Sequence, residues 1–309
     1  MNKLLIICGP TAVGKTNLGL KLAQKFNGQI ISADSRQVYQ GMDIGTGKDL
    51  PKNAKKHTSG YYLINNIKLW GYDLVKPDQE FSLAHFISFA KKTIAKIHQQ
   101  KQLPIIVGGT GLYLKAITQS LDTVNIPPNP KLRSQLNNKS VLQLQTILKK
   151  NNSKRFQDMN HSDQHNPRRL IRAIEISQSV IKPKKSLLNK MNILWLGLKA
   201  PFNVLDQRIK FRVDQRISQG SQQEVVKLIN QGYSFKLPSM SAMGYKQWQS
   251  FFAGKDDLKK VKETWITAEK QYLRRQLTWF TKKSQINWFD ITKPDYQKHI
   301  VKQIKAWYT

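Results

Sequence analysis

The sequence has one cysteine and no long apolar run. Cys8 is the only cysteine among 309 residues, so neither an intrachain disulfide nor a cysteine-based zinc site can form. The longest early apolar run, Leu4 to Cys8, is far shorter than the ~20 residues that cross a bilayer. The N-terminus lacks the basic region, long apolar segment and cleavage site of a signal peptide. These absences exclude a disulfide scaffold and predict a cytoplasmic protein outside the membrane.

Acidic residues are also scarce. The 51 Lys and Arg residues face 19 Asp and Glu residues, which gives a net charge of +32. Such an excess predicts a polyanionic partner, although lysine enrichment can also reflect genome composition or solubility. Hydrophobic residues make up 39% of the chain, which argues against wholesale disorder. The length suits one large domain or two modest ones.

The first 118 residues alternate between strand and helix patterns. Helical spacing extends over residues 16–26 and 83–97, with Ser82 as the expected N-cap of the second helix. Short apolar runs that are typical of buried strands cover residues 4–8, 30–34 and 103–107. This alternation predicts an α/β fold, in which a parallel sheet is flanked by helices on both faces.

The pattern changes after the proline-rich break at residues 127–130. Residues 131–190 are helical in pattern and contain 14 Lys and Arg against 3 Asp and Glu. A strand-like run returns at 193–198, and mostly helical patterning follows it. We therefore predict a core of residues 1–118 and 193–309 with a helical C-terminal region. Residues 119–192 are expected to form a basic, all-helical insertion domain.

A phosphate-binding motif follows the first apolar run. Its residues are Gly9, Pro10, Thr11, Ala12, Val13, Gly14, Lys15 and Thr16, and they match G-x-x-x-x-G-K-[ST]. A buried strand precedes the motif and an amphipathic helix follows it, as in a P-loop. The backbone N–H groups and Lys15 would bind phosphate oxygens, and the Thr16 hydroxyl would bind Mg²⁺. The motif leaves open whether the anion is ATP or another diphosphate.

Two further features lie at the same predicted sheet edge. Asp34 ends the second strand, where it could be a Mg²⁺ ligand, a helix cap or a general base that faces the phosphate site. The glycine-rich turn 108–111 ends the third strand. It could be a tight connection with Thr110 as an N-cap, but beside a P-loop a ligand-facing turn is the better interpretation.

Arginine clusters occur in two stretches. Arg168, Arg169 and Arg172 fall within five positions, and on a helix Arg168 and Arg172 share a face. Guanidinium groups this close repel one another unless an anion lies between them, so they indicate either a phosphate backbone or a solvated helix face. Residues 274–280 mix cations with large aromatics, which suits phosphates and unpaired bases, although Leu277 and Phe280 fit a core.

Taken in order, the motifs of this chain resemble those of the tRNA dimethylallyltransferase family, also called tRNA isopentenyltransferases. The resemblance spans nearly the whole chain. It rests on Gly9 to Thr16, Asp34-Ser35-Arg36-Gln37-Val38-Tyr39, Met42-Asp43-Ile44-Gly45-Thr46, Gly108-Gly109-Thr110-Gly111-Leu112-Tyr113, Asn166-Pro167-Arg168-Arg169-Leu170-Ile171-Arg172-Ala173-Ile174-Glu175, Met243-Gly244-Tyr245-Lys246-Gln247 and Arg274-Arg275-Gln276-Leu277-Thr278-Trp279-Phe280.

The resemblance implies a P-loop NTPase-like fold and a prenyl transfer reaction. The family moves a dimethylallyl group from its pyrophosphate ester to N6 of adenosine 37 in tRNAs that carry adenosines 36 and 37. By resemblance, Asp34 accepts the amine proton, while Lys15, Thr16 and Mg²⁺ stabilise the departing pyrophosphate. Arg212 matches a family arginine that reaches the pyrophosphate, and Arg208 is the weaker candidate.

The same resemblance implies a set of tRNA contacts. Thr110 and Arg133 match positions around the target nucleotide. The other matching positions are Asp34, Ser35, Arg36, Gln37, Arg168, Arg169, Leu170, Ile171, Arg172, Ser241, Gly244, Tyr245, Lys246, Gln247, Arg274, Arg275, Gln276, Thr278 and Trp279. We expect a monomer that binds the anticodon stem-loop.

The chain departs from the family pattern at several positions. Residues 45–49 read Gly-Thr-Gly-Lys-Asp where the commoner family sequence is Gly-Thr-Ala-Lys-Pro, so Gly47 and Asp49 depart from it. Arg216 stands where many relatives carry Met. Thr281 replaces a common Arg, so one phosphate contact could be missing, and Leu273 replaces a frequent Ala. With one cysteine, the zinc finger of eukaryotic relatives cannot form, which favours a bacterial-type enzyme. Two rival hypotheses are a P-loop small-molecule kinase and a non-catalytic RNA-binding protein.

Overall fold

The protein is built on one eight-stranded sheet. The computed structural model describes residues 2–51, 53–57, 60–119, 123–124, 126–179 and 191–308. The strand order is β3-β4-β5-β2-β6-β1-β7-β8. The strands are β1 (Lys3–Cys8), β2 (Gly28–Ser32), β3 (Lys55–His57), β4 (Tyr61–Ile64), β5 (Ile67–Trp70), β6 (Leu103–Gly108), β7 (Asn192–Lys199) and β8 (Asn287–Asp290).

The neighbouring strands β5, β2, β6, β1, β7 and β8 run parallel to one another, as the sequence predicts for the centre of the sheet. Of the described strands, only β4 runs antiparallel, because it pairs in opposite direction with β3 and β5. Cys8 at the end of β1 lies beside Gly108 of β6 and Gly197 of β7. The P-loop and the glycine-rich turn after β6 therefore begin at the same sheet edge.

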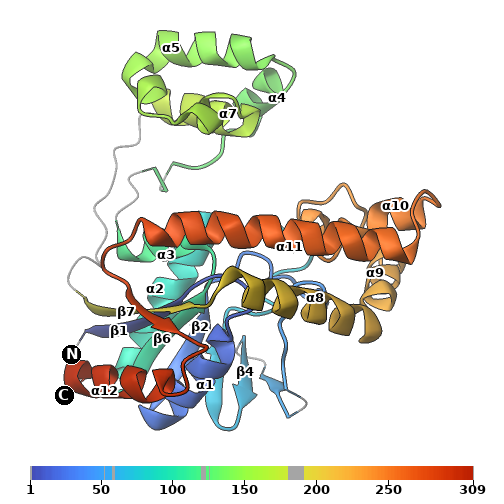
Figure 1. Cartoon of the computed structure of the whole chain (residues 1–309). Helices are drawn as coiled ribbons and strands as arrows, with labels where there is room; N and C mark the ends of the chain where they lie inside the picture. Colours follow the sequence, from blue (N-terminus) through green and yellow to red (C-terminus); the bar gives the residue numbers. More distant parts are fainter. Residues whose placement is uncertain are drawn as a thin grey trace. The chain divides into compact units, whose positions relative to one another are not determined.

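Helices cover the sheet and extend from it (Figure 1). The core-unit helices are α1 (Lys15–Lys25), α2 (Leu83–Gln99), α3 (Gly111–Thr118), α8 (Phe202–Ser218), α9 (Ser221–Asn230), α10 (Trp248–Phe252), α11 (Leu258–Thr281) and α12 (Tyr296–Tyr308). Leu5 and Ile7 of β1 pack in one cluster with Leu22 of α1 and Ile300 of α12. Ser82 caps α2 by accepting the His85 N–H at 3.3 Å, as predicted. Residues 202–308 are mostly helical, with β8 as the strand that the sequence did not predict.

Contacts divide the chain into two compact units, Met1–Thr118 with Lys190–Thr309, and Gln119–Asn189. The second unit corresponds to the predicted insertion of residues 119–192, except that it ends at Asn189. Its described residues form α4 (Pro130–Leu136), α5 (Val141–Gln157), α6 (His161–Gln164) and α7 (Pro167–Ser177). Leu144, Leu148, Leu170 and Ile174 are fully buried between these helices. In the described ranges, no helix combines the length and apolar character needed to span a bilayer.

Candidate active site

The P-loop joins β1 to α1 in a conformation that suits anion binding. At Gly9, φ is +138° and a Cβ would overlap the carbonyl oxygen of Leu198, so the close approach of the two segments requires glycine. Gly14 precedes α1 in a left-handed conformation, and no side chain caps this helix. The first N–H groups of α1 are therefore available to an anion, which the helix dipole also favours.

Lys15 is partly buried at this loop. Its Nζ donates to the Pro10 carbonyl at 2.6 Å, so this hydrogen bond joins the two ends of the P-loop. Burial, followed by the charge of Arg212, lowers the pKa of Lys15 to about 8, while the charge of Asp34 raises it. A bound polyanion would replace the carbonyl as partner and stabilise the charged amine.

Two arginines of α8 reach the P-loop from one helix face. Arg208 Nη1 donates to the Ala12 carbonyl at 3.2 Å. Arg212 Nη1 donates to Thr11 Oγ1 at 3.3 Å, and its Nη2 pairs with Asp49 at 2.9 Å. The structure thus places both predicted arginines at the loop. Arg212 also bridges to the loop that carries Asp49, which Arg208 does not.

Asp34 lies two residues beyond β2 at the same sheet edge. Its Oδ1 accepts the N–H groups of Arg36 at 2.8 Å and Gln37 at 3.4 Å, which stabilises a turn and not the helix start that a capping role would need. No hydrogen bond to Oδ2 is found among the described residues, so this oxygen can accept a proton. Asp34 is only partly buried, and therefore a substrate can reach it.

The negative charge of Asp34 acts on three tyrosines. Burial chiefly raises the pKa of Tyr72, Tyr113 and Tyr272, and the negative charge of Asp34 is the second cause for each. They come from the segment after β5, from α3 and from α11. Their hydroxyls stay protonated at neutral pH, so they are hydrogen-bond donors beside the carboxylate.

Gln276 of α11 joins the P-loop to the second glycine-rich turn. Its Oε1 accepts the Thr11 N–H at 2.8 Å, and its Nε2 donates to the Gly109 carbonyl at 3.0 Å. The side chain is buried. The prediction of Gln276 as a tRNA contact is therefore corrected, because both ends of its amide are occupied within the protein. The interpretation of turn 108–111 as part of the site fits this bridge.

Thr110 and Trp279 lie at the same turn. The Thr110 carbonyl accepts the Tyr113 and Leu114 N–H groups at the start of α3, and its hydroxyl contacts the Tyr272 hydroxyl. Trp279 packs so closely on Gly111 that a Cβ there would overlap the indole. The indole remains partly exposed, as a base-stacking surface requires.

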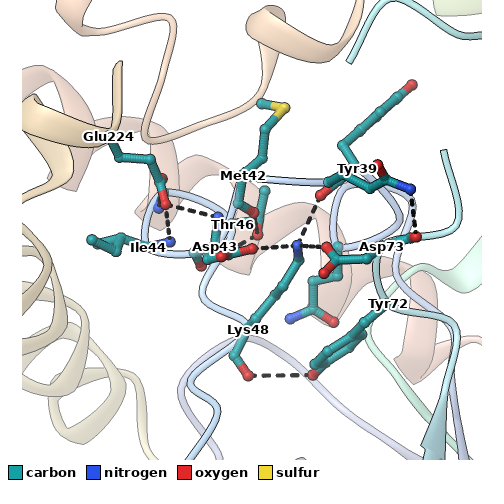
Figure 2. A network of polar contacts seen from close by, with 12 residues as sticks. Tyr39, Met42, Asp43, Ile44, Thr46, Lys48, Tyr72, Asp73 and Glu224 are labelled. Carbon is teal, nitrogen blue, oxygen red and sulfur yellow. Dashed lines mark hydrogen bonds and ion pairs between the residues drawn. The ribbon is translucent and has the colours of Figure 1, made fainter. Parts of the chain in front are cut away.

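The loop of residues 42–49 is fixed by two charged side chains, the partly buried Glu224 and the buried Lys48 (Figure 2). Glu224 of α9 accepts the N–H groups of Asp43, Ile44 and Gly45 at 2.8–3.0 Å. Lys48 is fully buried, donates to the Tyr39 carbonyl at 2.8 Å and pairs with Asp43 and Asp73. This network holds Asp49 in place beside Arg212. No local pattern in the sequence indicates this role for Glu224, which lies about 180 residues from the loop.

Tyr245 belongs to the same network and requires a correction. It was predicted to contact tRNA, but its side chain is fully buried and its hydroxyl donates to Glu224 at 2.5 Å. The neighbouring Gly244 is also buried, and its N–H donates to Gln247 Oε1 at 2.9 Å. Of this stretch, the exposed side chains are Ser241 and Lys246.

The remaining predicted contacts of the core unit lie at or near the surface. Arg36 donates to the Pro238 carbonyl at 2.8 Å and approaches Ser241 at 3.4 Å, so it connects the Asp34 turn to this exposed segment. Gln37 donates to the Gly47 carbonyl at 2.9 Å, and Ser35 is partly buried. Of the predicted contacts on α11, Arg274, Arg275 and Thr278 are exposed.

In the insertion, two of the predicted arginines already have an anionic partner. Arg133 holds the buried Glu175 carboxylate through Nε at 2.7 Å and Nη2 at 2.9 Å. Arg172 donates to the same carboxylate at 3.1 Å and to the Thr123 and Ile126 carbonyls. The expectation that these arginines need an external anion is therefore wrong for Arg172, because Glu175 supplies the charge.

The other members of this stretch divide between core and surface. Leu170 and Ile171 are buried in the core of the insertion, so their side chains are not available to tRNA as predicted. Arg169 pairs with Asp163 at 3.1 Å. Arg168 is exposed, and no ion pair to it is found among the described residues. Arg168 and the exposed face of Arg169 therefore carry the free positive charge of α7.

The groups around Thr16 fit a magnesium ion. The Thr16 hydroxyl contacts the Tyr72 hydroxyl, whose pKa the Asp34 and Asp49 carboxylates both raise. Thr16 and Asp49 also line one small pocket of about 190 Å³. Hydroxyl and carboxylate oxygens are the ligands that Mg²⁺ prefers, and it commonly completes its shell with phosphate oxygens and water.

Known proteins match this chain over nearly its full length. The family model for IPP transferase matches residues 37–283. A tRNA dimethylallyltransferase of Thermomicrobium roseum is 34% identical, covering 99% of this chain and 92% of that protein. One from Natranaerobius thermophilus is 36% identical, with coverages of 94% and 87%. The solved tRNA isopentenylpyrophosphate transferase of Bacillus halodurans is 32% identical, covers 100% and 98%, and has a TM-score of 0.70. The chain belongs to the IPP transferase family, as do these tRNA dimethylallyltransferases.

Proposed function

We propose that this protein transfers a dimethylallyl group from dimethylallyl pyrophosphate to N6 of adenosine 37 in tRNA. The observation that carries the proposal is that the carboxylate of Asp34 and the P-loop lie at the same sheet edge, where the charge of Asp34 raises the pKa of Lys15. A P-loop supplies an anion cradle, and a carboxylate next to it supplies a proton acceptor. Both belong to a chain of the IPP transferase family.

The P-loop would hold the pyrophosphate of the prenyl donor. Lys15, Arg212 and the first N–H groups of α1 would bind its oxygens, and Gln276 would keep the loop in shape. As the bond between the allylic carbon and oxygen breaks, negative charge grows on the leaving group. Cations and N–H groups that are already in place stabilise this charge.

Asp34 would accept a proton from the attacking amine. The new bond joins the allylic carbon to N6, the carbon–oxygen bond breaks, and the amine proton passes to Oδ2. The adenine amine is a weak nucleophile, because its lone pair is delocalised into the ring, so a carboxylate base lowers the barrier. The N–H groups of Arg36 and Gln37 fix Oδ1 and so orient the other oxygen.

Magnesium would bind at Thr16, with Asp34 or Asp49 near it. When bound, the ion would neutralise pyrophosphate charge and help the group to leave. The described residues contribute the hydroxyl and the carboxylates, and the pyrophosphate would contribute further oxygens.

The tRNA would bind through exposed cations on both units. In the core unit these are Lys246, Arg274 and Arg275, with the partly buried Arg36 beside them in the proposal, and in the insertion they include Arg168. Lysines and arginines at this density suit a phosphate backbone, and Trp279 suits a base flipped out of the anticodon loop. A monomer in the cytoplasm belongs to the same proposal.

The test supplies the protein with Mg²⁺, dimethylallyl pyrophosphate and unmodified tRNA, and follows pyrophosphate release. We expect release that depends on tRNA, with no consumption of ATP in a parallel reaction. ATP consumption that needs no tRNA, without pyrophosphate release from the prenyl donor, would favour the P-loop kinase. Binding of tRNA with neither reaction would favour the non-catalytic RNA-binding protein.

A further inference from the structure

The guanidinium of Arg216 fills the space that a side chain at residue 47 would need, although the two residues lie in distant segments. Gly47 lies in the loop 42–49 with φ at +63°, and a Cβ there would overlap the guanidinium of Arg216. The same point lies 3.1 Å from Arg212 Nη2. The two guanidinium groups of α8 therefore flank Gly47, and residue 47 can be nothing larger while Arg216 is present.

Arg216 is a buried cation with an incomplete set of partners. It is 5% exposed, and its Nη1 donates to Glu269 at 3.1 Å. The guanidinium also lies over the Trp265 ring, 6.0 Å from its centroid. Among the described residues, no hydrogen-bond partner is found for its Nε. A buried arginine with an unpartnered donor is costly, so a role beyond packing is expected of it.

The neighbour of Arg216 on α8 is the arginine that reaches the P-loop. Arg212 and Arg216 are one helical turn apart, so their positive charges repel. Arg212 is held between Thr11 of the P-loop and Asp49 of the loop 42–49. Repulsion from the buried Arg216 favours this outward position of Arg212, toward the phosphate site.

We infer that Gly47 and Arg216 are a coupled pair, and that Arg216 is a positioning residue for the diphosphate. It directs Arg212 to the P-loop and adds a buried positive charge behind it, and the missing Cβ at Gly47 makes room for this. Both positions are departures from the pattern that the family resemblance leads one to expect, so the structure explains two departures by one contact. The inference rests on the proposed use of the P-loop for pyrophosphate.

A double-mutant cycle tests the coupling. The variants are Gly47→Ala, Arg216→Met and the double substitution, and the readouts are pyrophosphate affinity by calorimetry, KM and kcat for dimethylallyl pyrophosphate, and melting temperature. Arg216→Met should weaken pyrophosphate binding about fivefold and raise the donor KM similarly, with kcat within about twofold, because the anion site loses a positive charge and no group that touches the reacting atoms changes. Loss of the partner of Glu269 should show separately, as a lower melting temperature. In the protein that keeps Arg216, Gly47→Ala should raise the donor KM about tenfold. In the Arg216→Met background the same substitution should raise it less than about threefold.

Matched controls separate the contact from backbone strain and loss of charge. Gly254 has φ at +68° with nothing within 4 Å of a Cβ, so Gly254→Ala repeats the strain without the overlap. Lys210→Met removes one positive charge from an exposed position of α8. Both controls should leave the donor KM and pyrophosphate affinity unchanged. If Gly47→Ala destabilises the fold, recovery of its melting temperature in the double variant still supports the coupling.

Each other outcome overturns a defined claim. Additive effects of the two substitutions, or unchanged pyrophosphate affinity in Arg216→Met, would overturn the inference about this pair. Lys15→Met separates that failure from a failure of the proposed function. If Lys15→Met binds pyrophosphate like the unaltered protein, the P-loop is not the pyrophosphate site, whatever the cycle shows.

Discussion

The side-chain oxygen of Gln276 accepts the backbone N–H of Thr11 at 2.8 Å, across 265 residues of sequence. Because the same amide donates to the Gly109 carbonyl, Gln276→Leu would leave two backbone groups of the site without partners. We expect the KM for dimethylallyl pyrophosphate to rise about tenfold, since a loosened P-loop binds the anion less well. The affinity for tRNA should change little, because the side chain is buried.

Gln271→Leu is the matched control for Gln276→Leu. Gln271 lies on the exposed face of the same helix, so its substitution should leave the donor KM unchanged. Steady-state kinetics and filter binding of tRNA provide the two measurements. A loss of tRNA affinity at an unchanged donor KM would restore Gln276 as a tRNA contact.

Asp34→Asn should separate catalysis from binding. The substitution keeps an oxygen that can accept the N–H groups of Arg36 and Gln37 but removes the proton acceptor. We expect turnover to fall about 10²- to 10⁴-fold while tRNA affinity stays within about threefold. Single-turnover kinetics on preformed tRNA complexes measures the chemical step, and Asp78→Asn at an exposed position is the control. Near-normal turnover in Asp34→Asn would remove Asp34 from the role of base.

The arginines of α7 should divide into a binding residue and a structural residue. Arg168 is exposed, so Arg168→Ala should weaken tRNA binding and reduce the slope of log K against log salt by about one. Its melting temperature should not change. Arg172 is bound to Glu175 and to two carbonyls, so Arg172→Ala should lower the melting temperature. Equal losses of tRNA affinity with equal stability in the two variants would contradict this division.

Acid should destabilise the insertion through Glu175. Burial alone would raise the pKa of this carboxyl, but hydrogen bonds from Arg133, Asn129 and Arg172 hold it below its usual value of 4.5. The unfolded state therefore binds the proton first as the pH falls. The stabilisation is complete above pH 4.5 and is lost as the pH falls through the lower pKa of the folded state.

Hydrogen exchange of residues 126–179 at several pH values measures this loss. Glu175→Gln should exchange faster than the unaltered protein at pH 7, because it cannot balance two guanidinium groups. It should also lose most of the dependence on pH below 4.5. The same pH dependence in both proteins would show that another carboxylate causes the acid sensitivity.

The sequence predicts the parts of the fold that local patterns encode. The buried strands and the helices after them follow from apolar spacing, and the P-loop follows from its motif. The hairpins β3–β5 were missed because the residues of β3 are exposed and polar. The turn between β4 and β5 did carry a signal, since Asn65 and Asn66 both adopt positive φ, which asparagine tolerates.

The site was predicted less completely than the fold, because its contacts join distant segments. Asp34, Lys15 and Arg212 could be named, since motifs or family resemblance identify them. Gln276 could be named too, but its role could not, because its partners lie in the P-loop and after β6. Glu224 carried no local signal of its part in the site. Charge spacing likewise could not reveal that Arg172 has an internal partner.

The most direct test of the account is the position of the transferred group. The protein is incubated with Mg²⁺, labelled dimethylallyl pyrophosphate and unmodified tRNA, and the tRNA is digested to nucleosides and fragments. The account predicts label on N6 of adenosine 37, and none in a tRNA in which guanosine replaces that adenosine. Label at another nucleotide, or none while ATP is consumed, would contradict it.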